Sequence, residues 1–173
     1  MSGSPTVDSI FSQRIVVGVG DMAVSSSAHA TISTYALGSC VGIVAYSEKF
    51  KAGGILHIML PYAKLSPDRA TRHPFVFADT GFYEFLRALG GLGLRLENTK
   101  IAIAGGASIL SSADIFKIGE RNVDAVKVIL DEHKIRPVFT DIGGFSNRTL
   151  HLNLGTGALD IKLPSELKTV SLA

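Results

Sequence analysis

The chain has 173 residues, of which 46% are hydrophobic and 18% charged, with a formal net charge of +2 at pH 7. This composition fits one globular domain and excludes a disordered chain or a strongly basic nucleic-acid-binding chain. No apolar run approaches the roughly 18 residues of a membrane-spanning helix. The single cysteine, Cys40, excludes a framework of intrachain disulfides and fits a reducing cytoplasm.

Residues 1–13 lack the basic start and the apolar core of a signal peptide. We expect them to form a flexible lead-in to a single domain over residues 14–164, with residues 165–173 as a C-terminal tail. The domain begins with a predicted strand at 15–19, followed by a small and polar stretch at 23–33.

Residues 18–23, Gly-Val-Gly-Asp-Met-Ala, match the G-x-G-x-x-A pattern after a strand. A dinucleotide site also needs a following helix and an acidic residue about 20 positions later. The serine-rich stretch after Ala23 is a poor helix, and no acid lies between Asp21 and Glu48. We therefore reject a nucleotide site.

Two apolar runs around a polar stretch at 47–51 predict a β-hairpin over residues 41–60. Opposed residues of a symmetric hairpin have a constant index sum, so a turn centred on Glu48-Lys49 puts Cys40 opposite His57. Their Cβ atoms would then lie roughly 4.5–5.5 Å apart. A thiol beside an imidazole is the minimum equipment for a thiolate nucleophile. The alternative is that both are core residues, and a bulge at Gly53-Gly54 would send their side chains to opposite faces.

The later pattern predicts, in chain order, a loop at 61–74, a helix closed by Gly90-Gly91, a strand at 100–104, a helix at 122–133, a strand at 136–140 and a hairpin over 150–163. The first helix has an apolar face of Phe82, Phe85, Leu86 and Leu89, and Asp79 or Thr80 can cap it. About seven strands and two or three helices result. Because strands and helices do not alternate strictly, we expect a mixed sheet or two packed sheets with helices on one side.

Other motifs predict neither a metal nor a cofactor. Residues 105–108, Gly-Gly-Ala-Ser, form either an anion-holding turn or a tight turn that needs glycine dihedrals, and we favour the tight turn. The five histidines show no metal-ligand spacing with one another or with Cys40. Ser39 lacks the Gly-x-Ser-x-Gly elbow of a serine nucleophile.

Several blocks resemble the CheD family, the chemoreceptor glutamine deamidases of bacterial and archaeal chemotaxis. They are Leu-Gly-Ser-Cys-Val at 37–41, His-Ile-Met-Leu-Pro at 57–61, Ala-Gly-Gly-Ala-Ser at 104–108, Ile-Gly-Glu-Arg-Asn-Val at 118–123, and Asp-Ile-Gly-Gly at 141–144 with Arg148 and Thr156-Gly157. They occur in the family's order over about residues 15–163. Several blocks at consistent spacing are far more specific than any single motif.

The resemblance implies an α/β (α+β) sandwich of mixed strands, cysteine-hydrolase-like, with helices on one side. It assigns Cys40 as nucleophile, His57 as general base and Thr34 as the residue that orients the imidazole. The stretch around Thr34 departs from the family's glycine-richer pattern, which leaves Ser33 and Thr31 as rivals. Backbone N–H groups of the turn at Gly38 and Ser39, together with that of Cys40, would hold the oxyanion.

The resemblance further implies a cytoplasmic enzyme that deamidates glutamines of methyl-accepting chemotaxis receptors, without a cofactor. The expected partners are the receptor's cytoplasmic domain and a CheC-type phosphatase, with no nucleic acid and no membrane insertion. One alternative is a non-catalytic adaptor that docks to receptors or to the phosphatase. Another is a hydrolase of small amides.

Overall fold

The computed structural model of the protein describes residues 12–108 and 116–173. Its strands are β1 (Gln13–Val17), β2 (Asp21–Ser25), β3 (Ala30–Leu37), β4 (Val41–Ser47), β5 (Ala52–Ile58), β6 (Lys100–Gly105), β7 (Phe139–Ile142), β8 (Arg148–Asn153), β9 (Ala158–Lys162) and β10 (Leu167–Ser171). Its α-helices are α2 (Pro67–Arg72), α3 (Ala78–Gly91) and α4 (Ile118–Glu132). Short 3₁₀ turns are η1 (Ala63–Leu65), η2 (Pro74–Val76) and η3 (Leu96–Asn98).

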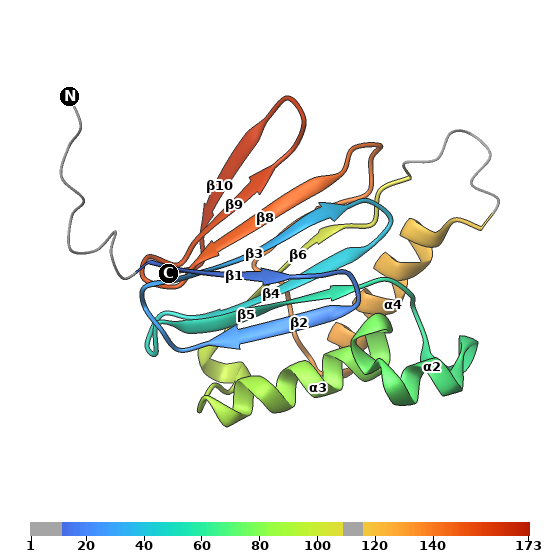
Figure 1. Ribbon diagram of the computed structural model, residues 1–173, viewed down its shortest axis with the longest axis horizontal. Helices are drawn as coiled ribbons and strands as arrows, with labels where there is room; N and C mark the ends of the chain where they lie inside the picture. Colours follow the sequence, from blue (N-terminus) through green and yellow to red (C-terminus); the bar gives the residue numbers. More distant parts are fainter. Residues whose placement is uncertain (1–11, 109–115) are drawn as a thin grey trace.

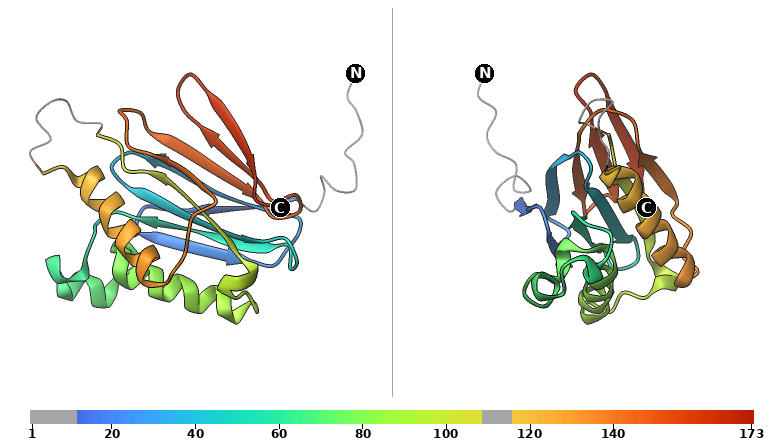
Figure 2. Two further views of the ribbon diagram at one scale, coloured as in Figure 1. Left: turned by 180° about the vertical axis from the view of Figure 1, so that it is seen from behind. Right: turned by 90° about the vertical axis from the view of Figure 1, so that its right-hand side faces the viewer.

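The strands form two five-stranded sheets that pack face to face. The inner sheet has the order β2-β5-β4-β6-β7, and the outer sheet has the order β1-β3-β8-β9-β10. All three α-helices lie on the inner sheet's side, so the molecule has three layers: helices, inner sheet and outer sheet (Figures 1 and 2). The prediction of a mixed α/β sandwich with helices on one side is therefore confirmed.

The central strands β4 and β5 are buried along their whole length. Alternate residues of a strand point to opposite faces, so Ile43 belongs to the core beneath the helices while Val44 belongs to the core between the sheets. Burial on both faces explains why these segments are continuous apolar runs with no polar alternation.

The predicted hairpin exists, but its predicted register is wrong by two residues. Ser47 pairs with Ala52, and Gly42, not Cys40, pairs with His57. The turn is centred one position later than expected, at Lys49-Phe50, because Ser47 still belongs to β4. Since a strand has a side-chain period of two, this shift leaves His57 on the face that the prediction gave it.

No bulge interrupts the hairpin at Gly53-Gly54, where both glycines pair regularly with β4. A Cβ on Gly54 would lie 2.5 Å from the Ala23 carbonyl oxygen of β2 and 2.9 Å from the Phe85 ring of α3, so close packing on both neighbours explains that glycine. The chain between β1 and β2 turns at Gly20, with φ +68°, and continues as a strand. No helix follows the G-x-G-x-x-A match, as the sequence predicted.

Other predicted boundaries differ from the structure. The stretch 23–33 ends β2 and begins β3, and the predicted loop 61–74 contains η1 and α2. The predicted caps of α3, Asp79 and Thr80, lie inside the helix, which begins at Ala78 after Phe77 and has no side-chain cap. The Asp79 carboxylate accepts hydrogen bonds from the Ala63 and Thr80 N–H groups. The second helix, α4, begins at Ile118, four residues earlier than predicted, and β7 begins only at Phe139.

The ends of the chain differ in how far the structure describes them. The predicted lead-in, residues 1–13, lies outside the described residues except for its last two. The segment predicted as a C-terminal tail contains β10, which pairs with β9 along its whole length. The described part of the chain thus has ten strands where about seven were expected. None of its helices combines the length and apolar character needed to cross a bilayer.

Candidate functional site

Cys40 lies in the turn between the two sheets, after β3 of the outer sheet and just before β4 of the inner sheet. The end of β3 is irregular, with a register shift between Thr34 and Leu37. Ala36 adopts a left-handed conformation there, with φ 56°, which costs a non-glycine residue about 1–2 kcal/mol. The backbone therefore bends sharply immediately before the cysteine.

The carbonyls of the cysteine turn all accept hydrogen bonds from outside the turn. The Gly38 carbonyl accepts from the Ala107 N–H at 2.8 Å, and the Cys40 carbonyl accepts from the Gly106 N–H at 2.7 Å. The Ser39 carbonyl accepts from the Asn122 amide at 2.9 Å. The Gly38 N–H already donates to Ala36, so the expectation that it binds an oxyanion is not supported by its geometry.

The turn after β6 provides two of these donors. Gly105 and Gly106 both have positive φ, 116° and 65°. A side chain at Gly106 would also meet Val123 of α4 and the Gly119 carbonyl. Only glycine tolerates such a backbone in this space, so the predicted need for glycine dihedrals is confirmed.

His57 lies near the end of β5, is fully buried, and points toward the outer sheet, where it meets Thr34 of β3. The Thr34 Oγ1 and His57 Nδ1 atoms are 2.7 Å apart. The Thr34 hydroxyl also donates to the Val17 carbonyl at 2.8 Å. The two residues thus meet across the interface between the sheets, although 23 positions separate them in the sequence.

This contact defines the histidine tautomer. A threonine hydroxyl has one hydrogen, and Thr34 gives it to Val17. The hydroxyl must therefore accept from His57, so Nδ1 carries the ring proton and Nε2 carries a lone pair. Nε2 is buried and has no hydrogen-bond partner among the described residues. An unprotonated, unpartnered Nε2 is the atom that a general base requires.

Cys40 lies just before β4, on the face of the inner sheet that also carries His57. Gly42 is the cross-strand partner of His57, and Cys40 precedes it by two residues, the spacing of side chains on one face. Cys40 also packs partly buried against the core between the sheets. Cross-strand alignment does not bring these residues together as predicted, because Cys40 lies two positions beyond the residue that pairs with His57.

Burial favours the uncharged form of both groups. It lowers the pKa of His57 to about 4, because the imidazolium is poorly solvated there. Burial also raises the pKa of the Cys40 thiol, against a smaller opposite effect of the hydrogen bond from its own N–H. At neutral pH the pair therefore consists of a thiol and a neutral imidazole.

The rival hydroxyls of β3 lie elsewhere. Ser33 is adjacent to Thr34 and so points the opposite way, where its hydroxyl is 2.7 Å from His151 Nδ1. Thr31, also an odd-numbered residue of β3, lies beside Ser33 and His151 on the outer surface. Thr34 is the hydroxyl that contacts His57.

Comparison with known proteins places the chain in a family. Residues 59–163 match the family model described as CheD chemotactic sensory transduction. A "Probable chemoreceptor glutamine deamidase CheD" of Solibacter usitatus is 37% identical over 147 residues, 85% of this chain and 87% of the relative. The chain belongs to the CheD family.

Two further CheD relatives come from other organisms. The "Chemoreceptor glutamine deamidase CheD" of Halalkalibacterium halodurans is 38% identical, covering 86% of this chain and 92% of that protein. A "Probable chemoreceptor glutamine deamidase CheD" of Pyrococcus abyssi is 40% identical, covering 87% and 91% of the two chains.

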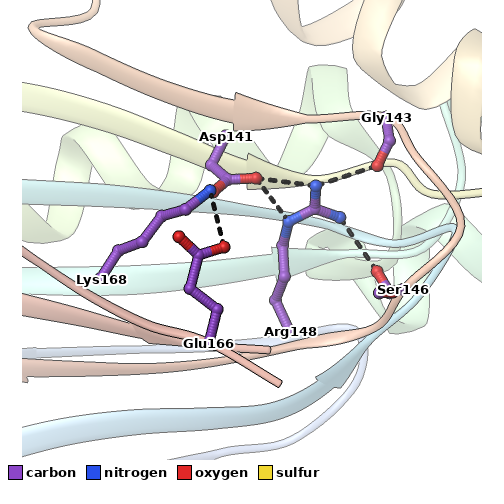
Figure 3. A network of polar contacts seen from close by, with 6 residues as sticks. All are labelled: Asp141, Gly143, Ser146, Arg148, Glu166 and Lys168. Atoms are coloured by element: carbon purple, nitrogen blue, oxygen red, sulfur yellow. Dashed lines mark hydrogen bonds and ion pairs between the residues drawn. The ribbon is translucent and has the colours of Figure 1, made fainter. Parts of the chain in front are cut away.

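An ionic network joins β7 of the inner sheet to β8 and β10 of the outer sheet (Figure 3). Arg148 of β8 bonds the Asp141 carboxylate and the carbonyls of Gly143 and Ser146. It thereby clamps the loop between β7 and β8. The Gly144 carbonyl in that loop accepts from the Ser108 N–H, next to the donor that binds Gly38.

Sequence reasoning assigned no role to three polar residues in this region. Asp141, Arg148 and Asn122 were identified only as parts of family blocks, and Asn122 also as the first residue of a predicted helix. Asn122 is fully buried and lies four residues before Val126, on the apolar face of α4. A polar residue on an otherwise apolar face was the available signal. No cluster of three or more potential metal ligands occurs in the described part of the chain.

Proposed function

We propose that this CheD-family protein deamidates glutamine side chains of chemotaxis receptors, with Cys40 as nucleophile and His57 as general base. The relatives' names supply the substrate class. The observation that carries the residue assignment is the Val17–Thr34–His57 chain of hydrogen bonds, which leaves Nε2 of His57 unprotonated on the side of the sheet that Cys40 approaches.

The first half of the reaction forms a thioester. Because both groups rest uncharged, His57 Nε2 takes the thiol proton as the sulfur attacks the glutamine amide carbon, and no stable ion pair precedes this step. The N–H groups of Ser39 and Cys40 would stabilise the oxyanion, a contribution of about 2.7–4 kcal/mol per donor in such sites. The imidazolium then protonates the amide nitrogen, the C–N bond breaks, and ammonia leaves.

The second half restores the enzyme. His57 Nε2 takes a proton from water, whose oxygen attacks the thioester carbon. The C–S bond breaks, and the sulfur recovers its proton from the imidazolium. The net reaction consumes one water and converts a glutamine into a glutamate and ammonia. Thr34 keeps Nδ1 protonated throughout, so the imidazole always exchanges protons at Nε2.

The substrate in this proposal is the helical cytoplasmic domain of a methyl-accepting receptor, and the reaction takes place in the cytoplasm. Deamidation replaces a neutral amide by a carboxylate and so changes the electrostatics between receptor helices. A CheC-type phosphatase is proposed as a second partner.

Intact mass spectrometry of a recombinant receptor cytoplasmic fragment tests the proposal. After incubation with the wild-type protein, the fragment should gain about 1 Da per modified site, the difference between NH₂ and OH. The Cys40→Ala variant should give no gain, because acyl transfer needs the thiolate.

His151→Ala is the matched control for His57→Ala, since both histidines lie in sheet strands but His151 faces the outer surface. Loss of activity in His57→Ala and its retention in His151→Ala would support the assignment. If the folded wild-type protein changes no receptor fragment from its own cell, the enzyme proposal fails and a receptor-binding adaptor is the better account. Turnover of free glutamine instead would indicate a small-amide hydrolase.

A further inference from the structure

Asn122 joins the two segments that carry the proposed nucleophile and base. Its Nδ2 donates to the Ser39 carbonyl and to the Met59 carbonyl, each at 2.9 Å. Ser39 immediately precedes Cys40, and Met59 follows His57 by two residues. One amide group, with two hydrogens, thus binds both segments at once.

The amide is held rigidly by the start of α4. Asn122 is fully buried, and Gly119 of the same helix lets α4 approach the turn after β6 closely. A Cβ on Gly119 would lie 2.6 Å from the Ala107 carbonyl oxygen and 2.7 Å from that of Gly106. The helix therefore holds Asn122 close to the cysteine turn, with both of its amide hydrogens engaged.

The bond to Ser39 determines where the Cys40 N–H points. In a planar trans peptide, the carbonyl of one residue and the N–H of the next point in opposite directions. Since the Ser39 carbonyl is directed at Asn122, the Cys40 N–H is directed away from the helix. That N–H belongs to the nucleophile residue itself, so it lies beside the position where a carbonyl carbon attacked by the sulfur would bond.

The bond to Met59 closes the open end of the β4–β5 ladder. The last pair of this ladder is Val41 with Ile58, and Met59 then turns away to donate to the Val76 carbonyl. Beyond this pair the ladder itself gives no link between the Cys40 turn and Met59. Asn122 supplies that link through the two carbonyls just beyond the last pair.

We infer that Asn122 is a positioning residue for the deamidation reaction, which aims the Cys40 N–H at the oxyanion and holds the Cys40 turn at a fixed distance from His57. This inference rests on the proposed function. The effect of the Asn122 side chain is specific to the transition state, because the Cys40 N–H meets a full negative charge only when the amide carbonyl has been attacked.

The kinetic test compares Asn122→Ala and Asn122→Gln with the wild-type protein on the receptor fragment. Asn122→Ala removes both donors, whereas Asn122→Gln keeps the amide but moves it by one methylene group. Both should lower kcat by about 10–100-fold with KM within about twofold, as expected when catalytic groups are misplaced by about 1 Å. Val126→Ala is the control, a buried truncation one turn along the same helix.

A second readout needs no substrate. Cys40 is the only cysteine, so isotope-labelled cysteine gives a single backbone amide signal in NMR. Both Asn122 variants should shift this signal, and Val126→Ala should leave it near its wild-type position. If Asn122→Ala does not fold, Asn122→Gln alone decides both measurements.

The outcomes distinguish a failure of the proposed deamidase function from a failure of the role inferred for Asn122. An inactive wild-type protein would overturn the proposed function, while the NMR comparison would still test the orientation of the Cys40 amide. An active wild-type protein whose Asn122 variants resemble Val126→Ala in kcat and in the amide signal would overturn the inference. A rise in KM at unchanged kcat would overturn it as well.

Discussion

At the scale of single residues, the site depends on how one hydroxyl hydrogen is used. Thr34 gives its hydrogen to the Val17 carbonyl and therefore accepts one from His57. If the Val17 carbonyl were absent, the hydroxyl could donate to Nδ1 instead, and Nε2 would then carry the proton. The nature of the proposed base thus depends on β1, although β1 contributes no group to the reaction itself.

Thr34→Val tests this dependence, because valine has nearly the same shape and no hydroxyl. We expect it to lower the deamidation rate by about 100-fold, as the tautomer is no longer fixed and Nδ1–H is left without a partner. The rate is measured from the mass gain of the receptor fragment. Ser33→Ala, the neighbouring hydroxyl directed at His151, should retain near wild-type activity, and equal losses in both variants would argue against Thr34.

At the scale of elements, the cysteine turn owes its shape to its neighbours. The turn after β6 gives backbone donors to the Gly38 and Cys40 carbonyls, and α4 gives a side-chain donor to Ser39. These three parts fit together only because Gly106 after β6 and Gly119 of α4 let the two segments approach each other closely. The positions of the helix and the cysteine turn are therefore coupled.

Gly106→Ala should break this coupling. Its φ of 65° is unfavourable for alanine, and the added methyl would meet Val123 and the Gly119 carbonyl. We expect a loss of at least about 2 kcal/mol in unfolding free energy from the left-handed strain and the clash, measured by urea denaturation. Gly90→Ala, a glycine of α3 with open space around it, should not destabilise the protein. Similar curves for the two variants would contradict this account.

At the scale of the whole molecule, an ionic network joins the two sheets near the site. Asp141 belongs to β7 of the inner sheet, whereas Arg148 and Lys168 belong to strands of the outer sheet. The Arg148 and Asp141 side chains are only 5% and 9% exposed, so water screens this pair weakly. Burial by itself would raise the pKa of Asp141, but hydrogen bonds and charges from Lys168 and Arg148 outweigh it and hold that pKa below its usual value.

Asp141 should therefore contribute to stability in a pH-dependent manner. Because its pKa is lower in the folded state than the roughly 3.9 of the unfolded chain, its contribution is present above about pH 4 and is lost as the pH falls through the folded value. Asp141→Asn should lower the unfolding free energy at pH 7 by about 3 kcal/mol and flatten its decline below about pH 4.

Urea denaturation as a function of pH measures both effects of Asp141→Asn. Glu84→Gln is the matched control, since Glu84 pairs with Arg87 on the exposed surface of α3. That variant should change the unfolding free energy by at most about 1 kcal/mol. An undiminished acid dependence in Asp141→Asn would show that other groups are responsible for it.

The sequence by itself determined the family, the mixed α/β class, the central hairpin and the identities of Cys40, His57 and Thr34 as candidates. These follow from local apolar patterns and from blocks whose order can be read along the chain. Only the tertiary structure decided the hairpin register, the place of Cys40 two positions beyond the partner of His57, and the choice of Thr34 over Ser33 and Thr31 as the contact of the imidazole.

The physical reason is that these decisions depend on contacts between distant segments. The hairpin register follows from where β4 ends and how Gly53 and Gly54 of β5 pack. The tautomer of His57 follows from the hydrogen bond that Thr34 donates to β1. The role inferred for Asn122 requires α4, the cysteine turn and the end of β5 to meet at one point. A periodic pattern indicates which face of an element is buried. It does not indicate which polar group of another element contacts that face.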